Sequence, residues 1–403
     1  MKLLGFEIKR LTPFVDATRG FMSTIFGDTA GVVVNETTAL SLSAYWAGVR
    51  RISESVAMLP IDVFRKQGDT REKVNHKTEY ILNAEANLQT IAFDYTQMLI
   101  TSAINHGNGL AIIERDGFGN PTGLVNVRKN LCEPIELDKE VVWNVKIDDT
   151  TTLRVFDRDM INLRGFGTHP VIGLSAIKIH AQNLGLSIAA QKYGSDFYTK
   201  GTRIDGFLAY DGKLETDTKK KIADSWRSNY GQGGSGGTAI LDAGIKYERL
   251  GLPPEDAQFI ETRKFQKNEV ATILGLPPYM VNDLDGGTFS NIEHQGIEFV
   301  TYGIGGWIEK IEQEYRRKLL KENEKSTHYF KHNINRLLRT DVKAKAEYYR
   351  LMTDIGVYSI NDVRELEDEN PVANGDSRYV QLNRIPIEQI ETYYAKDRAD
   401  SGT

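Results

Sequence analysis

The sequence predicts an α+β fold in which a mixed first domain is followed by two long helices that enclose a small α/β insert. Short strand patterns fill the chain up to about residue 164, and helical periodicity with an apolar seam then covers 173–201. A second, charged amphipathic segment covers 253–275. Because residues 202–252 carry strand and turn signals of their own, we expect them to form a compact unit between the two helices.

The chain begins with a segment that has little regular pattern. Residues 1–40 are expected to form a loosely structured arm, with a short strand as an option at 32–34. Helical spacing starts near Ser41, and either Ser41 or Ser43 is a suitable cap for this helix. The predicted apolar face of the helix consists of Trp46, Val49, Ile52 and Val56.

Strand and helix signals alternate through the rest of the first domain. The predicted elements are strands over 61–64, 110–115 and 141–145, a helix near 92–104, and a tight turn at 116–121. This alternation indicates a mixed α+β domain.

The seam of the first long helix repeats in steps of three and four residues, which is typical of a helix that packs along another helix. Its members are Leu174, Ile177, Ala181, Leu184 and Ile188. A continuous helix of about 26 residues would extend roughly 40 Å. Gly185 and Gly194 weaken this helix by about 1 kcal/mol each relative to alanine.

The insert contains a glycine-rich loop that imitates two catalytic motifs. Residues 231–236 fit the dinucleotide-binding pattern, and 233–237 fit the nucleophile-elbow pattern. Both motifs need a strand before the loop and a helix after it. Here a helix predicted to end near Tyr230 precedes the loop and a predicted hairpin over 238–248 follows it, so we interpret the loop as a flexible surface segment.

Composition and charge restrict the function classes. A formal net charge of -5 argues against a protein that grips nucleic acid over a broad basic face, although it is compatible with one that lets DNA pass without adhering. The single cysteine, Cys132, is expected to be a small buried residue and fits a reducing compartment. Charges interrupt the N-terminal residues too early for a signal peptide, and no apolar run approaches the roughly 20 residues that span a bilayer. No membrane partner is expected.

Residue patterns for catalysis and metal binding are also weak. No G-x-x-x-x-G-K-[ST] motif occurs, so an ATPase that acted with this chain would be another protein. His328 and His332 have a spacing that suits two metal ligands on a helix, but no carboxylate or cysteine partner is evident and 327–330 looks extended. We therefore predict no catalytic residue, no cofactor and no metal site.

A long helical pattern follows the second amphipathic segment. Its apolar face consists of Ile304, Ile308, Ile311, Tyr315 and Leu319. Two acid-first pairs, Glu312–Arg316 and Glu314–Lys318, have the favourable four-residue spacing. These charges either cover a solvated face or, in a ring, meet the next subunit.

Several separated motifs, taken together in this order, resemble one known family. They lie at 107–109, 164–166, 173–177, 254–258, 275–278, 288–293, 298–300 and 337–341. With them the chain resembles tailed-bacteriophage portal proteins from about Ala39 to about Ile387, and in particular the shorter portal family of siphophages and prophages. The resemblance implies an elongated subunit with an α/β wing, a two-helix stem, a small α/β clip and a helical C-terminal crown.

The implied map covers the whole chain. It assigns an N-terminal arm to 1–40, the wing to 41–172 and 292–333, the stem to 173–201 and 253–275, the clip to 202–252, a tunnel loop to 276–291, and the crown and tail to 334–403. The clip residues implied to face the terminase or connector are Asp217, Lys219, Lys220, Asp224 and Arg227.

The resemblance places the tunnel loop at the narrowest point of a DNA channel. The implied loop residues are Asn282, Asp283, Asp285, Gly286, Gly287, Thr288, Phe289, Ser290 and Asn291. Asp283 and Asp285 would repel phosphates and let DNA slide, and the two glycines would let the loop shift. Phe289 either wedges against the next subunit or touches DNA, and the alternative for the whole loop is a simple surface turn.

The implied function is mechanical. Family members form a homo-oligomeric ring, usually a dodecamer, at one capsid vertex, through which double-stranded DNA enters and later leaves. The implied partners are the terminase large subunit, the major capsid protein, the head–tail connector and, in some cases, a scaffold, within a virion assembled in the host cytoplasm. Two other classes stay open: a metal-dependent DNA-processing enzyme that uses Asp283 and Asp285, and a monomeric helical adaptor.

Overall fold

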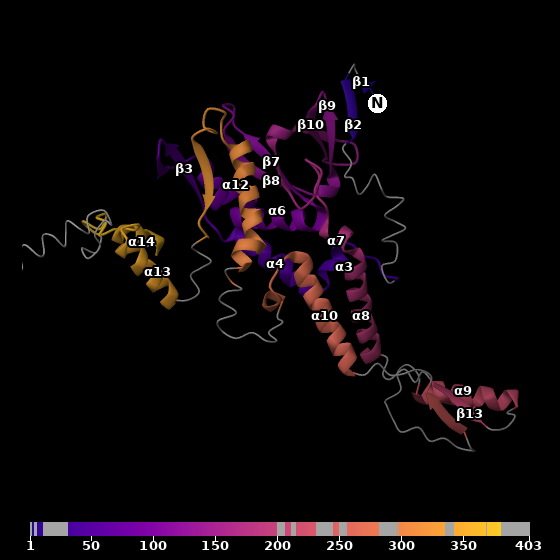
Figure 1. Ribbon diagram of the computed structural model, residues 1–403. Helices are drawn as coiled ribbons and strands as arrows, with labels where there is room; N and C mark the ends of the chain where they lie inside the picture. The colour runs from indigo at the N-terminus through magenta and orange to yellow at the C-terminus, as the bar shows by residue number, and fades with distance from the viewer. Residues whose placement is uncertain are drawn as a thin grey trace, which may run out of the picture. The chain divides into compact units, whose positions relative to one another are not determined.

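The computed structural model describes residues 2–3, 6–10, 31–199, 206–210, 215–230, 245–249, 256–281, 296, 298–334, 342–367 and 369–379. By its internal contacts the chain divides into two units, Met1–Asn333 and Ile334–Thr403, and each is described by itself. Figure 1 labels many of the helices and strands.

The first unit mixes helices with short strands. Its helices are α3 (Glu36–Leu40), α4 (Ser43–Ala57), α5 (Thr78–Asn83), α6 (Ala92–His106), α7 (Ala176–Ile179), α8 (Ala181–Thr199), α9 (Thr216–Tyr230), α10 (Asp256–Leu274) and α12 (Gly305–Leu319). Short 3-10 helices are η1 (Lys129–Leu131), η2 (Asp157–Asp159) and η3 (Pro278–Val281), and η4 (Phe299–Ile304) is a π-helix.

The strands form small sheets. They are β1 (Lys2–Leu3), β2 (Phe6–Arg10), β3 (Ile61–Gln67), β4 (Thr70–Lys73), β5 (Glu85–Asn87), β6 (Thr90–Ile91), β7 (Asn108–Arg115), β8 (Pro121–Val127), β9 (Cys132–Leu137), β10 (Glu140–Lys146), β11 (Thr152–Phe156), β12 (Met160–Arg164), β13 (Gly206–Tyr210), β14 (Ile245–Arg249) and β15 (His328–His332). The sheet orders are β1-β2-β9-β10-β11, β12-β7-β8 and β15-β3-β4, with the pairs β5-β6 and β13-β14. All the described pairings are antiparallel, which with the separate helices confirms the α+β prediction.

The start of α4 differs from the prediction. Residues 32–34 form no strand, because Asn35 begins the short helix α3 by accepting a hydrogen bond from the Thr38 backbone N–H. Leu42 is therefore the residue that precedes α4, and it provides no side-chain cap. Ser41 instead donates its hydroxyl to the carbonyl of Thr38.

The buried face of α4 is also rotated from the predicted one. Three predicted members are buried, namely Val49, Ile52 and Val56. Trp46, however, is 53% exposed, and its neighbour Tyr45 is fully buried in its place. The Tyr45 hydroxyl donates to Asn105 Oδ1 at 3.0 Å, which ties α4 to α6. This hydrogen bond allows a polar aromatic group to take the core position.

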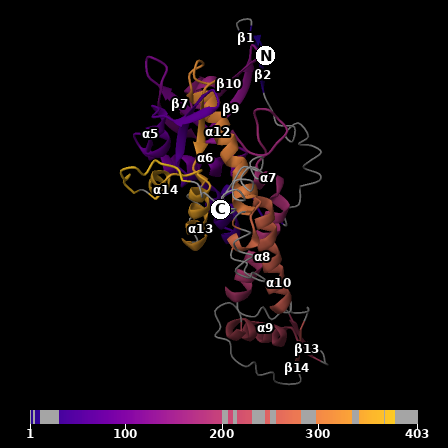
Figure 2. The same ribbon diagram turned by 60° about the vertical axis from the view of Figure 1, so that its left-hand side comes forward.

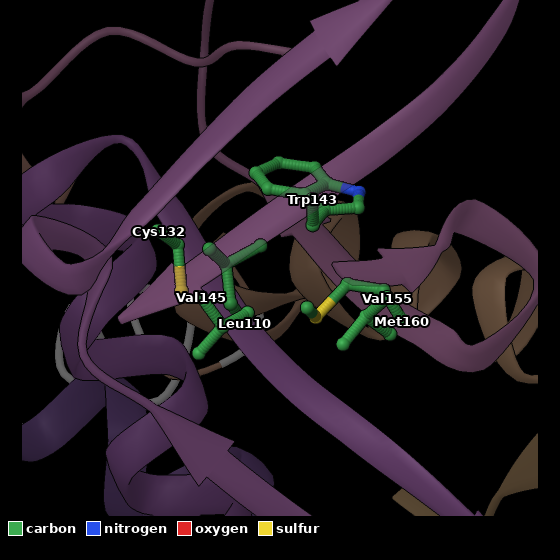
Figure 3. Close-up of a cluster of buried hydrophobic side chains, with 6 residues drawn as sticks. All are labelled: Leu110, Cys132, Trp143, Val145, Val155 and Met160. Atoms are coloured by element: carbon green, nitrogen blue, oxygen red, sulfur yellow. The ribbon is translucent and has the colours of Figure 1, made fainter. Parts of the chain in front are cut away.

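One apolar cluster joins two of the sheets. It contains Leu110, Cys132, Trp143, Val145, Val155 and Met160, from strands β7 and β9 to β12 (Figure 3). The burial of Cys132 confirms the expectation for this residue, and burial raises the pKa of its thiol to about 11.

Helix α12 packs against β12 and β15 through its predicted apolar face. All five members are buried: Ile304, at the end of the π-helix, and Ile308, Ile311, Tyr315 and Leu319. Tyr315 and Phe330 meet edge to face, with their ring centroids 6.0 Å apart. The helix thereby joins the segment after residue 298 to sheets formed near the start of the chain.

The second unit contains α13 (Val342–Asp354) and α14 (Ile360–Leu366). Gly356, with φ +72°, follows α13. Ser359 and Asp362 form a capping box at the start of α14. Tyr349 of α13 donates its hydroxyl to Glu367 at 2.7 Å, which holds the two helices together.

Candidate functional site

The two long helices α8 and α10 lie side by side and run in opposite directions (Figures 1 and 2). Asn183 Nδ2 of α8 donates to Glu269 Oε2 of α10 at 3.1 Å. Leu184 on one helix and Val270 and Ala271 on the other are buried. We refer to α8 and α10 as the stem helices.

The first stem helix does not begin where the periodicity predicted. Gly173 donates its N–H to Asn108 Oδ1 at 3.1 Å, and Leu174 donates its N–H to the Phe166 carbonyl at 2.7 Å. Both residues therefore lie outside the helix, because their backbone N–H groups are bonded to Asn108 and Phe166 and not to a preceding helical turn.

Two further features divide the predicted continuous helix into α7 and α8. Ser175 accepts a hydrogen bond from the Lys178 N–H and so caps α7, while its hydroxyl donates to the Asn105 carbonyl at 2.5 Å. His180, with φ -102° and ψ 23°, then interrupts the helical backbone. Half-burial lowers the pKa of His180, against the opposing effect of Glu269.

The five predicted seam residues lie on three segments. Leu174 precedes α7, Ile177 is in α7, and Ala181, Leu184 and Ile188 are in α8. Ile177 and Leu184 are buried, whereas the other three are half-buried. Their joint role in stem packing remains a prediction.

Three glycines bring the end of α6, the end of β12 and the segment before α7 together. Gly107 ends α6 with φ +87°, and its carbonyl accepts a hydrogen bond from the Gly165 N–H at 2.8 Å. A Cβ at Gly107 would lie 2.6 Å from the Gly173 carbonyl carbon, and one at Gly173 would lie 2.9 Å from the Gly165 nitrogen. Three of the family-like motifs therefore meet at one point, where only residues without a side chain fit.

The end of α10 is anchored on α4. Gly275 has φ +67°, and the Leu276 N–H donates to the Ala271 carbonyl at 2.8 Å, which closes the helix. A Cβ at Gly48 of α4 would overlap the side chain of Leu274 and lie 3.0 Å from Leu276 Cδ1. The end of α10 is thus packed directly on α4.

The predicted tunnel loop lies between two buried anchors. Its residues 282–291 are outside the described part of the chain, so the roles of Asp283, Asp285 and Phe289 remain predictions. The described first part of the loop contains η3, which ends at the buried Val281, and beyond the loop Phe299 is buried at the start of the π-helix. A Cβ at Gly303 would lie 2.7 Å from Phe299 Cδ2, so Phe299 packs on the bare backbone of the next turn.

The predicted clip face lies on α9. Asp217, Lys219, Lys220 and Asp224 are exposed on this helix, and Arg227 belongs to its last turns. Strand β14 pairs with β13 in register from Gly206 opposite Arg249 to Tyr210 opposite Ile245. The other predicted strand of the insert, 238–241, lies outside the described residues.

A cluster of buried charged side chains lies at the end of α12, and its burial was not predicted. Glu312 and Lys318, predicted on a solvated or subunit-facing surface, are both buried. Lys318 Nζ lies 2.5 Å from Asp157 Oδ2 and 3.9 Å from Glu314 Oε1. Burial lowers the pKa of Lys318 and raises the pKa of Glu314. The i,i+4 spacing of Glu314 and Lys318 was a signal for their pairing but not for their burial.

Glu312 also has partners different from the predicted Arg316. Its carboxylate accepts hydrogen bonds from the His332 backbone N–H at 2.8 Å and from Lys331 Nζ at 3.1 Å, and it lies 3.0 Å from His332 Nδ1. Arg316 donates to the Lys325 carbonyl instead. His332 thus serves to fix β15 on α12.

Within the described ranges, no cluster of three or more His, Cys, Asp or Glu side chains is arranged to hold a metal ion. Among the helices formed by the described residues, none has the length and apolarity to span a membrane.

Sequence comparisons identify related proteins. The sequence pattern of the family described as "Phage portal protein" matches residues 43–368. The portal protein of Enterobacteria phage HK97 is 27% identical over 365 residues, which cover 89% of this chain and 86% of that protein. The probable portal protein of Streptomyces phage phiC31 is 28% identical over 360 residues, covering 86% and 78%.

Solved structures with a similar fold come from phage-like particles. A chain in the virion of a native gene transfer agent particle has a TM-score of 0.58 at 18% identity, covering 86% of this chain and 94% of its own length. An HK97-family phage portal protein from Corynebacterium diphtheriae has a TM-score of 0.55 at 15% identity, covering 77% and 99%. A chain in the neck of a gene transfer agent particle, computed with C12 symmetry, has a TM-score of 0.54 at 17% identity, covering 87% and 100%.

Proposed function

The chain belongs to the phage portal protein family, and we propose that its copies form a closed ring at one vertex of a phage or phage-like capsid. In this ring the subunits surround a channel through which double-stranded DNA enters during packaging and leaves during ejection. The ring is also the place where the head joins the tail. Its subunit is a structural component of the virion, and the proposal assigns it no catalytic activity.

The observation that carries the proposal is the antiparallel pair of stem helices, anchored at one end on the wing. The Leu274 side chain at the end of α10 packs on the bare backbone of Gly48, and Gly107 and Gly173 meet backbone to backbone just before α7. A rigid connection of this kind suits a subunit that bears mechanical load from DNA. The C12 symmetry of a fold neighbour supports a ring of about a dozen copies.

Electrostatics support the passage of DNA without tight binding. The net charge of -5 disfavours the broad phosphate contact that makes nucleic-acid binding strong. Asp283 and Asp285, in the proposed tunnel loop, would repel phosphates at the narrowest point. The DNA is therefore expected to slide without regard to its sequence.

The proposed partners meet different parts of the subunit. The exposed charges of α9 are proposed to face the terminase large subunit during packaging and the head–tail connector afterwards. The major capsid protein would surround the ring, with a scaffold as an optional partner during assembly in the host cytoplasm. DNA translocation would be driven by the ATPase of the terminase.

The test is the assembly state of the purified full-length chain. Mass photometry and negative-stain images are expected to show a ring of about a dozen subunits with a central hole, a number suggested by the C12 symmetry of a fold neighbour. The same measurement with co-expressed major capsid protein examines whether assembly needs the capsid. A chain that stays monomeric in both samples would overturn the proposal.

A second experiment tests the absence of catalysis. Supercoiled plasmid incubated with the purified ring and Mg²⁺ or Mn²⁺ is expected to stay intact. Metal-dependent cleavage that is lost in Asp283→Ala would identify a DNA-processing enzyme instead.

A further inference from the structure

The outward face of α8 is apolar, and two of its large side chains are about half exposed within the described part of the chain. Leu186 is 53% exposed and Tyr193 is 51% exposed, and both lie opposite the buried Leu184. Ala189 and Ala190 are half-buried between them. The four residues follow the i, i+3, i+4, i+7 spacing and so share one face of the helix. Four residues with this spacing form the hole that receives a side chain in knobs-into-holes packing. We call this set, Leu186, Ala189, Ala190 and Tyr193, the α8 hole.

Among the described side chains of α10, one large aromatic group lies on the outward face. Phe265 is 63% exposed, while the adjacent Gln266 is buried on the inner side of the helix. Its neighbours on the outward face, Glu261 and Thr272, are polar and exposed. Phe265 is therefore an apolar knob on a polar face. Exposed aromatic side chains held on rigid elements are typical anchors of protein interfaces.

We propose that Phe265 of one copy inserts into the α8 hole of the next copy around the ring. This inference rests on the proposed ring and assigns one contact within it. A closed ring needs two different, complementary surfaces on each subunit. The two stem helices supply such surfaces on their opposite outward faces: small residues framed by Leu186 and Tyr193 on one, and a protruding phenyl ring on the other.

The heights of the two surfaces agree. The hydrogen bond between Asn183 and Glu269 sets these residues level with each other. Phe265 is four residues before Glu269 and Ser187 is four residues after Asn183. Because the two helices are antiparallel, Phe265 therefore lies level with Ser187. A rotation about the ring axis leaves heights along the axis unchanged, so with stem helices that run along the axis Phe265 meets the next α8 near Ser187.

The direction of the side chains brings the knob into the hole. Helical side chains lean toward the N-terminus of their own helix. Phe265 therefore leans along α10 toward Asp256, the N-terminal end of that helix. The side chains of α8 lean the opposite way, so the two sets converge.

Charge adds to the match at the edge of this contact. Glu261 lies eight residues from Glu269, which places it level with Gln191 and beside Lys192 of α8. Glu261 and Lys192 are both exposed. Opposite charges at the rim favour this pairing and register over others.

A disulfide experiment tests the contact. Cys132 is buried, and burial raises the pKa of its thiol to about 11, so introduced thiols are the accessible ones. Full-length Ala189→Cys/Phe265→Cys rings are expected to give a ladder of covalent oligomers on mild oxidation. Neither single substitution should give a ladder, because the proposed contact joins two different residues. The matched control is Gln182→Cys/Phe265→Cys, which moves the thiol about 10 Å along the same face, beyond disulfide reach.

The outcomes separate this contact from the ring itself. Rings of the double variant that give no ladder would overturn the contact and leave the proposed function standing. Failure of the unmodified chain to form rings, alone or with capsid protein, would refute the proposed function first.

A second variant tests the same contact if the chain with both cysteine substitutions does not fold. Phe265→Ala is expected to raise the subunit concentration at half-assembly by about tenfold or more, because an interface anchor is lost. Phe118→Ala removes another highly exposed phenyl ring, on the β7–β8 turn, and is expected to assemble normally. Equal assembly of Phe265→Ala and the unmodified chain would overturn the proposed contact.

Discussion

Replacing Gly107 by alanine tests the contact between the wing and the start of the stem. Gly107 has φ +87°, which costs an alanine about 1–2 kcal/mol. The new Cβ would also lie 2.6 Å from the Gly173 carbonyl carbon and 2.9 Å from the Leu174 carbonyl carbon. Both are backbone atoms that cannot rotate away, so overpacking adds about 1–3 kcal/mol. The expected loss in unfolding free energy is therefore about 2–5 kcal/mol.

Gly119 is the matched control for this substitution. It has φ +78°, but a Cβ there would meet no atom within 4 Å. Gly119→Ala should therefore lose only about 1–2 kcal/mol. Chemical denaturation followed by circular dichroism measures both variants against the unmodified chain. If Gly107→Ala were no less stable than Gly119→Ala, the close approach of Gly107 and Gly173 would be wrong.

Two further predictions concern the buried charges of α12. The Lys318 side chain is only 2% exposed, and Asp157→Ala removes the carboxylate nearest to its ammonium group. We therefore expect this variant to lose about 3 kcal/mol of unfolding free energy, measured by chemical denaturation. Glu322→Ala removes an exposed pair with Lys325 and should cost less than about 1 kcal/mol; a similar loss in both variants would contradict the assignment. Burial of Glu312 raises the pKa of its carboxyl group, but the hydrogen bonds from His332 and Lys331 lower this pKa by a larger amount. The pKa of Glu312 in the folded chain therefore lies below the unfolded value of about 4.3. The ionised carboxylate therefore stabilises the fold above about pH 4.3, and this stabilisation is lost as the pH falls through the folded pKa. Between about pH 6 and pH 3.5, Glu312→Gln should lose less unfolding free energy than the unmodified chain. A steeper loss in the variant would refute this explanation.

Local patterns predicted much of the architecture. The apolar face of α12 is buried as its spacing indicated, and Cys132 lies in an apolar cluster. The expected second stem helix appears as α10, Asp256–Leu274. These features depend on neighbouring residues along one element, and for that reason a single sequence is enough to detect them.

The candidate site was predicted less completely. The two long helices follow from periodicity and the charged residues of α9 were implied by the family resemblance, whereas the outward knob at Phe265 and the α8 hole needed the packing of the two helices. Residue spacing shows which side chains share a face, but it does not show which face a partner helix covers.

Local residue patterns specify the order of the elements and the family motifs, whereas tertiary contacts set where several elements begin and which polar groups are buried. Asn105 and Asn108 accept hydrogen bonds from Ser175 and Gly173, residues more than sixty positions away, and these bonds replace the predicted helix start. Lys318 is buried because Asp157 pairs with it across the fold. A buried donor or charge must find a partner, and that partner is set by the folded chain and not by its neighbours in sequence.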